Sequence, residues 1–161
     1  MSAVFAWSES NGGGEAVTDS PSNLNFGSLD APNLTPATYP IVGGENSYEK
    51  YIRAKFTGTF TEISSMKFWK LSGAYKTGED IHCAGNVAYT APVATTSVVA
   101  TVTIPTTEGT AIDVQSTEGD TTKLTVIGTY TKYLCLQLQS TVSTPGGAVN
   151  TKSFKFKYNE V

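Results

Sequence analysis

The sequence has few charged residues and no surplus of positive charge. Lysine, arginine, aspartate and glutamate make up 16% of the 161 residues, against about 25% in an average soluble domain. The net charge of −3 offers no basic surface to a nucleic-acid backbone, so we expect no nucleic-acid partner. No apolar run approaches the roughly 20 residues that a bilayer-spanning helix needs. We therefore expect no membrane partner.

The first residues lack the features of a secretory signal. Met1 to Trp7 contain neither a basic start nor a long apolar centre. We therefore expect the protein to be assembled in the cytoplasm of the cell that makes it.

Cysteine and histidine are scarce, which argues against a metal or thiol site. Cys83 and Cys135 are too few for a disulfide scaffold, and two free thiols are favoured over a single bridge. His82 is the only histidine, and it precedes Cys83 directly. Neighbours in a strand point to opposite faces, so the two side chains are poorly placed as metal ligands or as a base and nucleophile. We predict no metal site and no cofactor.

The acidic residues do not group in a way that predicts catalysis. Many follow turn signals, where carboxylates are usually solvated or bind local backbone: Glu15, Asp19, Glu45, Glu79, Asp80, Glu108, Glu118 and Asp120. Paired carboxylates of the glycosidase type are therefore disfavoured. We predict a protein that is not an enzyme, with no catalytic residue.

What the sequence does contain is typical of many short strands. Threonine is common, and its branched side chain favours strands, whereas the 15 glycines favour turns. Apolar and polar residues alternate in about eight segments, and no window shows a 3.6-residue repeat. The segments are 48–56, 63–71, 81–89, 98–104, 112–114, 124–127, 133–139 and 153–158.

This pattern predicts an all-β fold, an antiparallel β-sandwich of the jelly-roll or immunoglobulin-like type. Trp69 and the pair Tyr133 and Cys135 match part of the immunoglobulin pattern. Cys83 follows the tryptophan strand instead of preceding it, however, so the immunoglobulin disulfide is not supported.

Residues 1–45 differ from the rest and predict an extended N-terminal arm, with the sandwich domain at 46–161. Pro21, Pro32, Pro36 and Pro40 fix φ and remove backbone donors, so a helix is excluded there. Apolar side chains nonetheless occur along the segment and need a surface to lie on, either the body of the domain or a neighbouring subunit. The candidate partner-binding residues are Phe5, Trp7, Leu24, Phe26, Leu29, Leu34 and Tyr39.

Two further surface features leave alternatives open. Tyrosines such as Tyr75 and Tyr89 could form a platform for glycans, or else lie at sheet edges. Lys50, Arg53 and Lys55, with Lys152, Lys155 and Lys157, form two basic stripes, which are either solvated edge protection or complementary to an acidic neighbour.

Several phrases resemble the small, Thr/Gly-rich structural proteins in the virions of tailed bacteriophages. They include Trp7-Ser-Glu-Ser-Asn-Gly, Ala31-Pro-Asn-Leu-Thr-Pro-Ala, Ser47-Tyr-Glu-Lys-Tyr-Ile-Arg, the Leu-Gln-Leu-Gln of residues 136–139 and the closing Phe154-Lys-Phe-Lys-Tyr-Asn-Glu-Val. The resemblance spans most of the chain. It rests on overall composition and short sequence phrases, and it includes no catalytic motif.

The resemblance implies a β-sandwich in the virion, as a head decoration (cement) protein or as a neck or tail component. Its partners would be the major capsid protein or other virion proteins, and it would form a homo-oligomer, with a trimer favoured. On this hypothesis, removing residues 1–45 leaves a soluble sandwich that no longer binds the particle. A glycan-binding or adhesin module is the alternative from another class.

Overall fold

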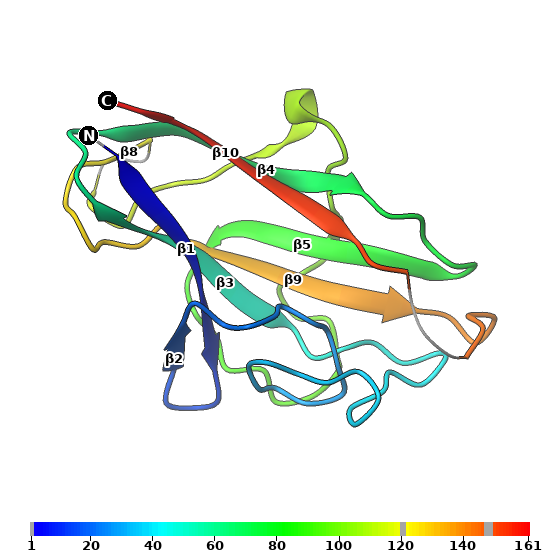
Figure 1. The fold of residues 1–161 in the computed structure, drawn as a ribbon. Coiled ribbons are helices and arrows are strands. Elements are labelled where there is room, and N and C mark those ends of the chain that lie inside the picture. Colours follow the sequence, from blue (N-terminus) through cyan, green and yellow to red (C-terminus); the bar gives the residue numbers. More distant parts are fainter. Residues whose placement is uncertain (1, 120–121, 147–149) are drawn as a thin grey trace.

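The structure is a computed structural model that describes residues 2–119, 122–146 and 150–161. In these residues the chain forms β-strands, one 3₁₀ turn (η1, Glu108–Thr110) and no α-helix (Figure 1). None of them forms a helix long and apolar enough to cross a membrane. The strands are β1 Ala3–Asn11, β2 Ala16–Asp19, β3 Lys50–Gly58, β4 Ile63–Ser72, β5 Glu79–Val87, β6 Val102–Thr103, β7 Ile112–Asp113, β8 Lys123–Leu124, β9 Tyr133–Ser140 and β10 Ser153–Glu160.

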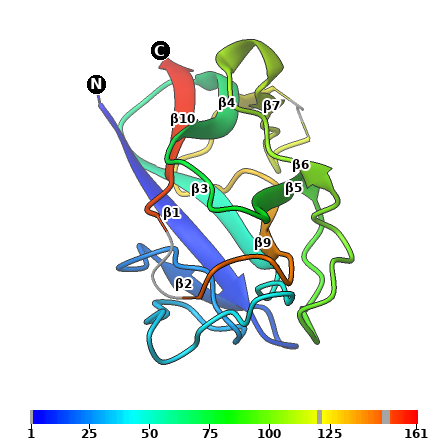
Figure 2. The same cartoon turned by 90° about the vertical axis from the view of Figure 1, so that its right-hand side faces the viewer.

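The strands form two antiparallel sheets that pack face to face. Sheet A has the order β2-β1-β3-β9-β5-β6, and sheet B has the order β10-β4-β7, with β8 also paired to β4. Sheet B lies above sheet A in both views (Figures 1 and 2). The prediction of an all-β, sandwich-like fold is confirmed.

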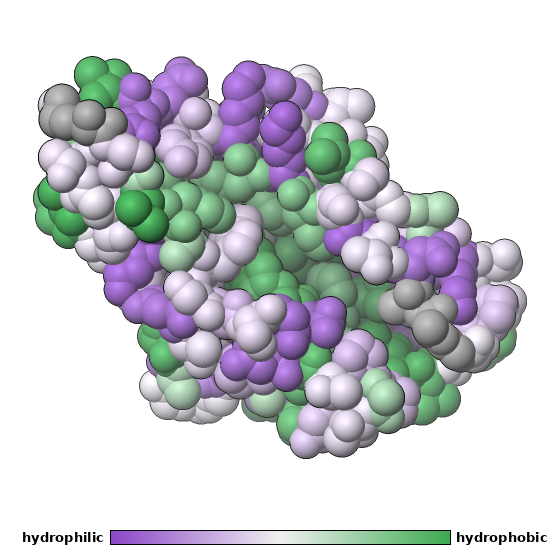
Figure 3. Space-filling view, in the orientation of Figure 1, coloured by the Kyte–Doolittle hydropathy of each residue, from purple (hydrophilic) through white to green (hydrophobic). Residues whose placement is uncertain are grey.

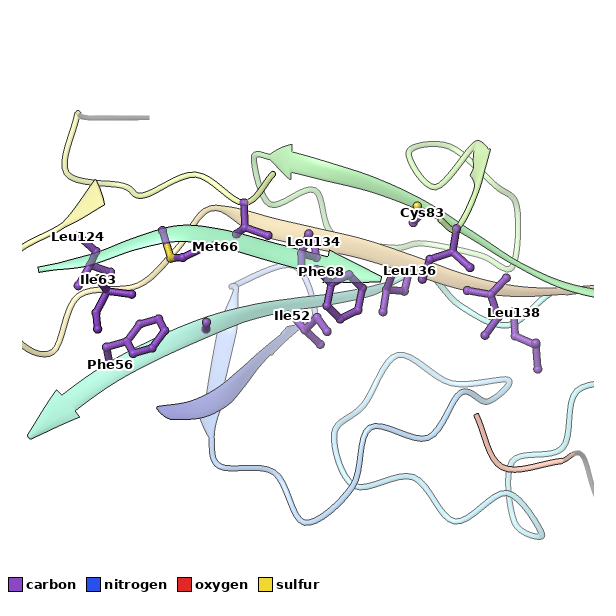
Figure 4. Close-up of a cluster of buried hydrophobic side chains, with 14 of the residues drawn as sticks. Ile52, Phe56, Ile63, Met66, Phe68, Cys83, Leu124, Leu134, Leu136 and Leu138 are labelled. Carbon is purple, nitrogen blue, oxygen red and sulfur yellow. The ribbon is translucent and has the colours of Figure 1, made fainter. Parts of the chain in front are cut away.

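The core between the sheets follows the period-2 alternation of the sequence. Ile52, Ala54 and Phe56 of β3 are buried on the same face of sheet A as Leu134 and Leu136 of β9. Figure 4 shows the side chains of β3, β4 and β9 gathered in this layer. Large apolar side chains from both sheets therefore leave the water together, which is the main favourable contribution to folding.

The expected extended arm is wrong for its first part, because residues 3–19 are strands of sheet A. β1 pairs with β3 from Ala3 opposite Gly58 to Ser10 opposite Tyr51, and β2 turns back to pair with β1. The physical reason is an alternation within β1, in which Phe5 and Trp7 face the core. Phe5 stacks on Phe156, with 5.3 Å between the ring centroids. These two additional strands bring the described number to ten instead of about eight.

Residues 20–49 contain no strand in the structure, as the prolines predict. This segment covers one side of sheet A. Leu34 is buried, and Leu24 and Phe26 pack against the main core. The segment is thus held on the body of the same molecule through its apolar side chains.

The strand expected at 98–104 is reduced to the two residues of β6. The amide groups of Val98, Val99 and Ala100 donate to Oε1 of the buried Glu49, at 2.9, 2.6 and 2.8 Å. Because these donors are bound by one carboxylate, they are not available for a strand ladder. The segment before β6 therefore lies as a loop over the outer face of sheet A, where Ala100 and Val99 cover Tyr51 and Cys135.

Candidate binding groove

A groove opens on one side of the sandwich, between β10 and the segment that follows β2. Its volume is about 290 Å³. Figure 3 shows it as a hollow with apolar side chains at its base and polar groups around its rim. The floor consists of Ile52, Phe68 and Leu136, the walls of Trp7, Leu24, Phe26 and Phe154, and the polar lining of Asn25, Lys50 and Lys152.

Three of the seven candidate partner-binding residues meet in this groove, namely Trp7, Leu24 and Phe26. The other four lie elsewhere. Phe5 packs among the aromatic rings of the core, and Leu34 is buried. Leu29 and Tyr39 remain exposed, at 39% and 37% of their surface.

Lys50 brings a buried positive charge to the groove, whereas the sequence pattern placed it in a basic stripe that is either solvated or complementary to an acidic neighbour. Its side chain is only 5% exposed, and its Nζ donates to Oε1 of Glu9, which is fully buried. The same oxygen accepts Nδ2 of Asn11 at 3.1 Å, and Asn11 Nδ2 also donates to Asp30 at 2.8 Å. A buried ammonium needs such a partner, because desolvation of an isolated charge is costly.

Lys50 also keeps hydrogen-bonding capacity toward the groove. An ammonium has three N–H donors, and among the described residues the side chain donates to one oxygen only. Glu9 Oε2, on the far side of the pair, has no hydrogen-bond partner in the described part of the chain. The lining therefore combines an apolar base with an ammonium that can donate to a carbonyl or carboxylate of a ligand.

Lys152, the second cation of the groove, is likewise buried and paired. Its side chain is 7% exposed, and its Nζ lies 2.7 Å from both carboxylate oxygens of Glu79. Tyr75 lies beside this pair, with Lys152 Nζ 5.6 Å from the centre of its ring. Burial, followed by the charge of Asp80, raises the pKa of Tyr75 to about 12, so the phenol stays neutral at physiological pH.

The burial of Lys50 could have been predicted from its distance in sequence to the apolar residues of β3. Lys50 lies two residues before Ile52 and so shares the inner face of β3, whereas Arg53 and Lys55 share the outer face. Lys152 precedes β10 by one residue. It lies two residues before Phe154 and so shares the parity of the inward-facing Phe154, Phe156 and Tyr158, whereas Lys155 and Lys157 have the opposite parity. Of the expected stripes, Lys55 pairs with Asp19 at 2.6 Å and Lys157 pairs with Glu108.

The two thiols are free and lie on opposite faces of sheet A. Cys83 is opposite Leu136 in the register, and Cys135 is opposite the next residue, Ala84. Burial raises the pKa of Cys83 to about 11, and that of Cys135 is raised as well. Both sulfurs are therefore protonated at neutral pH, a state in which a thiol is a poor nucleophile.

His82 contacts one acidic residue. Its Nε2 lies 3.3 Å from Oδ2 of Asp80, on the same face of β5. Within the residues that the structure describes, no three histidine, cysteine or acidic side chains are placed to hold a metal ion.

No protein-family model, curated protein or solved structure matches this chain.

Proposed function

We propose that the chain is a non-enzymatic structural protein of a tailed-bacteriophage virion, most specifically a capsid decoration protein. The observation that carries the proposal is the groove, whose walls include Trp7, Leu24 and Phe26. In this proposal the groove receives an apolar side chain of the partner, the major capsid protein or another virion protein.

The composition of the groove suits protein docking. A concave site with aromatic walls gives a partner side chain a large apolar contact, and such pockets are where interface energy concentrates. The free donors of Lys50 can then bind a backbone carbonyl beside that anchor. A ligand held by these two features would be a peptide segment with a buried apolar residue.

The resemblance to virion proteins supports the assignment to a particle. It implies assembly in the host cytoplasm, many copies in the virion and a homo-oligomer, with a trimer favoured. Binding now shifts from a free arm to the groove, because β1 and β2 are paired in sheet A. Contacts between subunits would use strand edges such as β10, the outermost strand of sheet B. The finer classification, jelly-roll or immunoglobulin-like, stays a prediction.

Co-sedimentation tests this function. Purified protein is mixed with particles of the phage that encodes it, after their own copies have been removed, and the bound fraction is measured after centrifugation. We expect Phe26→Ala to weaken binding at least about tenfold, as is typical for loss of a central aromatic anchor.

Tyr39→Ala is the matched control, because Tyr39 belongs to the same segment and lies outside the groove lining. It should bind as the unmodified protein does. Phe26→Ala should melt somewhat lower because it loses contacts with the core, so circular dichroism at the binding temperature checks that both variants are folded. If the protein does not bind particles at all, the virion proposal is wrong. If it binds and Phe26→Ala binds equally well, the groove is not the docking site.

The position on the particle is a separate question that labelling of intact virions answers. Gold-labelled antibody on the head supports a decoration protein, and labelling of the neck or tail supports the other virion role.

A further inference from the structure

A second pocket lies on the outer face of sheet A, away from the groove. Its volume is about 570 Å³, within the range of small-molecule sites. Glu15, Arg53, Tyr89, Lys132 and Tyr133 contribute to its lining. β3 separates the two sites, because Ile52 points into the groove and the next residue, Arg53, points into this pocket.

Arg53 is held here by two aromatic rings, and among the described residues its side chain donates no hydrogen bond. Its guanidinium carbon lies 3.9 Å from the centre of the Tyr130 ring and 4.5 Å from that of Tyr133. The side chain is 15% exposed, and its nearest acidic oxygen is Oε1 of Glu15, 3.9 Å from Nη2. That distance is too long for a hydrogen bond. In the described part of the chain the buried Nε has no partner either.

A guanidinium has five N–H donors in a fixed fork that matches a carboxylate. Two aromatic rings orient this fork, and Arg53 is one of the residues that line the pocket. A carboxylate placed there would form charge-assisted hydrogen bonds that the free protein leaves unmade. Lys132 adds a second cation at the lining, so two positive charges accompany the single carboxylate of Glu15.

The negative charge and the acceptor oxygens of Glu15 limit which ligands can bind in the pocket. Its Oε1 accepts the hydroxyl of Tyr133 at 2.6 Å, and its side chain is 44% exposed. A carboxylate in this position repels a ligand with several negative charges but accepts hydrogen bonds from hydroxyl groups. The best match is a ligand with one carboxylate for Arg53 and several hydroxyls for Glu15.

We infer that the pocket around Arg53 and Glu15 binds a hydroxylated carboxylic acid of the hexuronic-acid class, as part of a glycan. Tyr89 supplies an aromatic wall and is fixed by its hydroxyl, which donates to the carbonyl of Gly12 at 2.7 Å. The site is independent of the groove and of docking to a particle.

Calorimetric titration tests the inference with three probes, namely a galactose trimer in which one residue is galacturonic acid, the neutral galactose trimer and a short peptide that contains one glutamate. We expect the trimer with one galacturonic acid to bind at least about tenfold more tightly than the other two, because only it offers both a single carboxylate and several hydroxyl groups. Its affinity should fall as salt is raised, since the attraction is partly ionic.

Arg53→Gln should lower that affinity at least about tenfold. Arg53→Lys should retain only part of the affinity, because a lysine ammonium lacks the forked arrangement of donors in a guanidinium. Lys55→Gln, two residues along the same face, is the matched control and should bind as the unmodified protein does. Should Arg53→Gln fail to fold, the salt dependence and the probe preference of the unmodified chain still decide. Equal binding of acidic and neutral trimers, tighter binding of the peptide, or no binding of any probe would overturn the inference.

Discussion

At the scale of single residues, the positions hardest to predict are charged side chains that share the two-residue spacing of the buried apolar residues in their strand. Lys50 has the spacing of a core residue of β3 and the chemistry of a surface residue. A reading of charge alone places it in solvent, whereas the structure buries it against Glu9. Glu9 has the same property in β1, two residues after Trp7. The pairing could not be predicted from sequence, because it requires the knowledge that β1 lies beside β3.

Lys50→Met should lower the free energy of unfolding by about 3 kcal/mol, because the Glu9 carboxylate then stays buried without its cation. Chemical denaturation measures this loss. Lys55→Met is the control, since its pair with Asp19 is partly exposed and should be worth less than about 1 kcal/mol.

A double variant distinguishes a broken ion pair from a simple packing defect. Glu9→Leu combined with Lys50→Met removes both charges, and we expect it to recover much of the stability lost in Lys50→Met. A double variant that is less stable than the single one would mean that the pair is not the cause.

At the scale of elements, strands with clear alternation could be predicted and irregular segments could not. β3, β4, β9 and β10 lie where period-2 patterns place them, with ends shifted by one or two residues. β1 was missed because nearby prolines and glycines gave the whole segment the character of a loop. The segment before β6 was assigned wrongly because its alternating valines also fit a strand, and the contact with Glu49 that binds its amides is remote in sequence.

The place of β1 changes the expected outcome of truncation. Removing residues 1–20 takes Phe5 and Trp7 from the core and uncovers one side of Phe56 and Phe156, which lose their ring contacts with β1. We therefore expect the truncated chain to aggregate or to lose cooperative unfolding, instead of remaining a soluble sandwich. Size-exclusion chromatography and thermal melting measure this.

Point variants refine the same test where the truncated chain cannot be purified. Trp7→Ala should cost about 3 kcal/mol or more, as is usual for a tryptophan in a packed core. Leu29→Ala, in a side chain that is 39% exposed, should cost less than about 1 kcal/mol. A soluble truncated protein with a sharp melting transition would contradict the structural role of β1.

At the scale of the whole molecule, sheet A separates two sites of different chemistry. The groove on its inner side is apolar with paired lysines, and the pocket on its outer side contains Arg53, whose buried Nε has no hydrogen-bond partner among the described residues. The sequence indicated three groove residues through their apolar character in a proline-rich segment. For the pocket it placed Tyr89 in the glycan-platform alternative and Arg53 in a basic stripe, but it did not join them, because the tyrosines and Glu15 come from distant segments that only the sheet brings together.

The same sheet buries ionisable groups in their neutral form, which predicts a loss of stability in alkali. Burial raises the pKa of Cys83 from 9.0 to about 11, and those of Tyr89 and Tyr133 from 10.0 to about 12. As the pH rises above about 9, the unfolded chain releases these protons before the folded chain does. The unfolded state then binds fewer protons, so the free energy of unfolding must fall with increasing pH until the folded groups also ionise.

Urea unfolding at pH values from about 8 to about 11 measures this fall. Tyr133→Phe should be less stable than the unmodified protein near pH 8, because Glu15 and Ser10 lose the phenol oxygen to which each is hydrogen-bonded. Its stability should nevertheless decline less steeply with pH, since one fewer buried phenol is linked to folding. A flat profile in the unmodified protein, or an equal slope in the variant, would show that these groups are not held neutral by the fold.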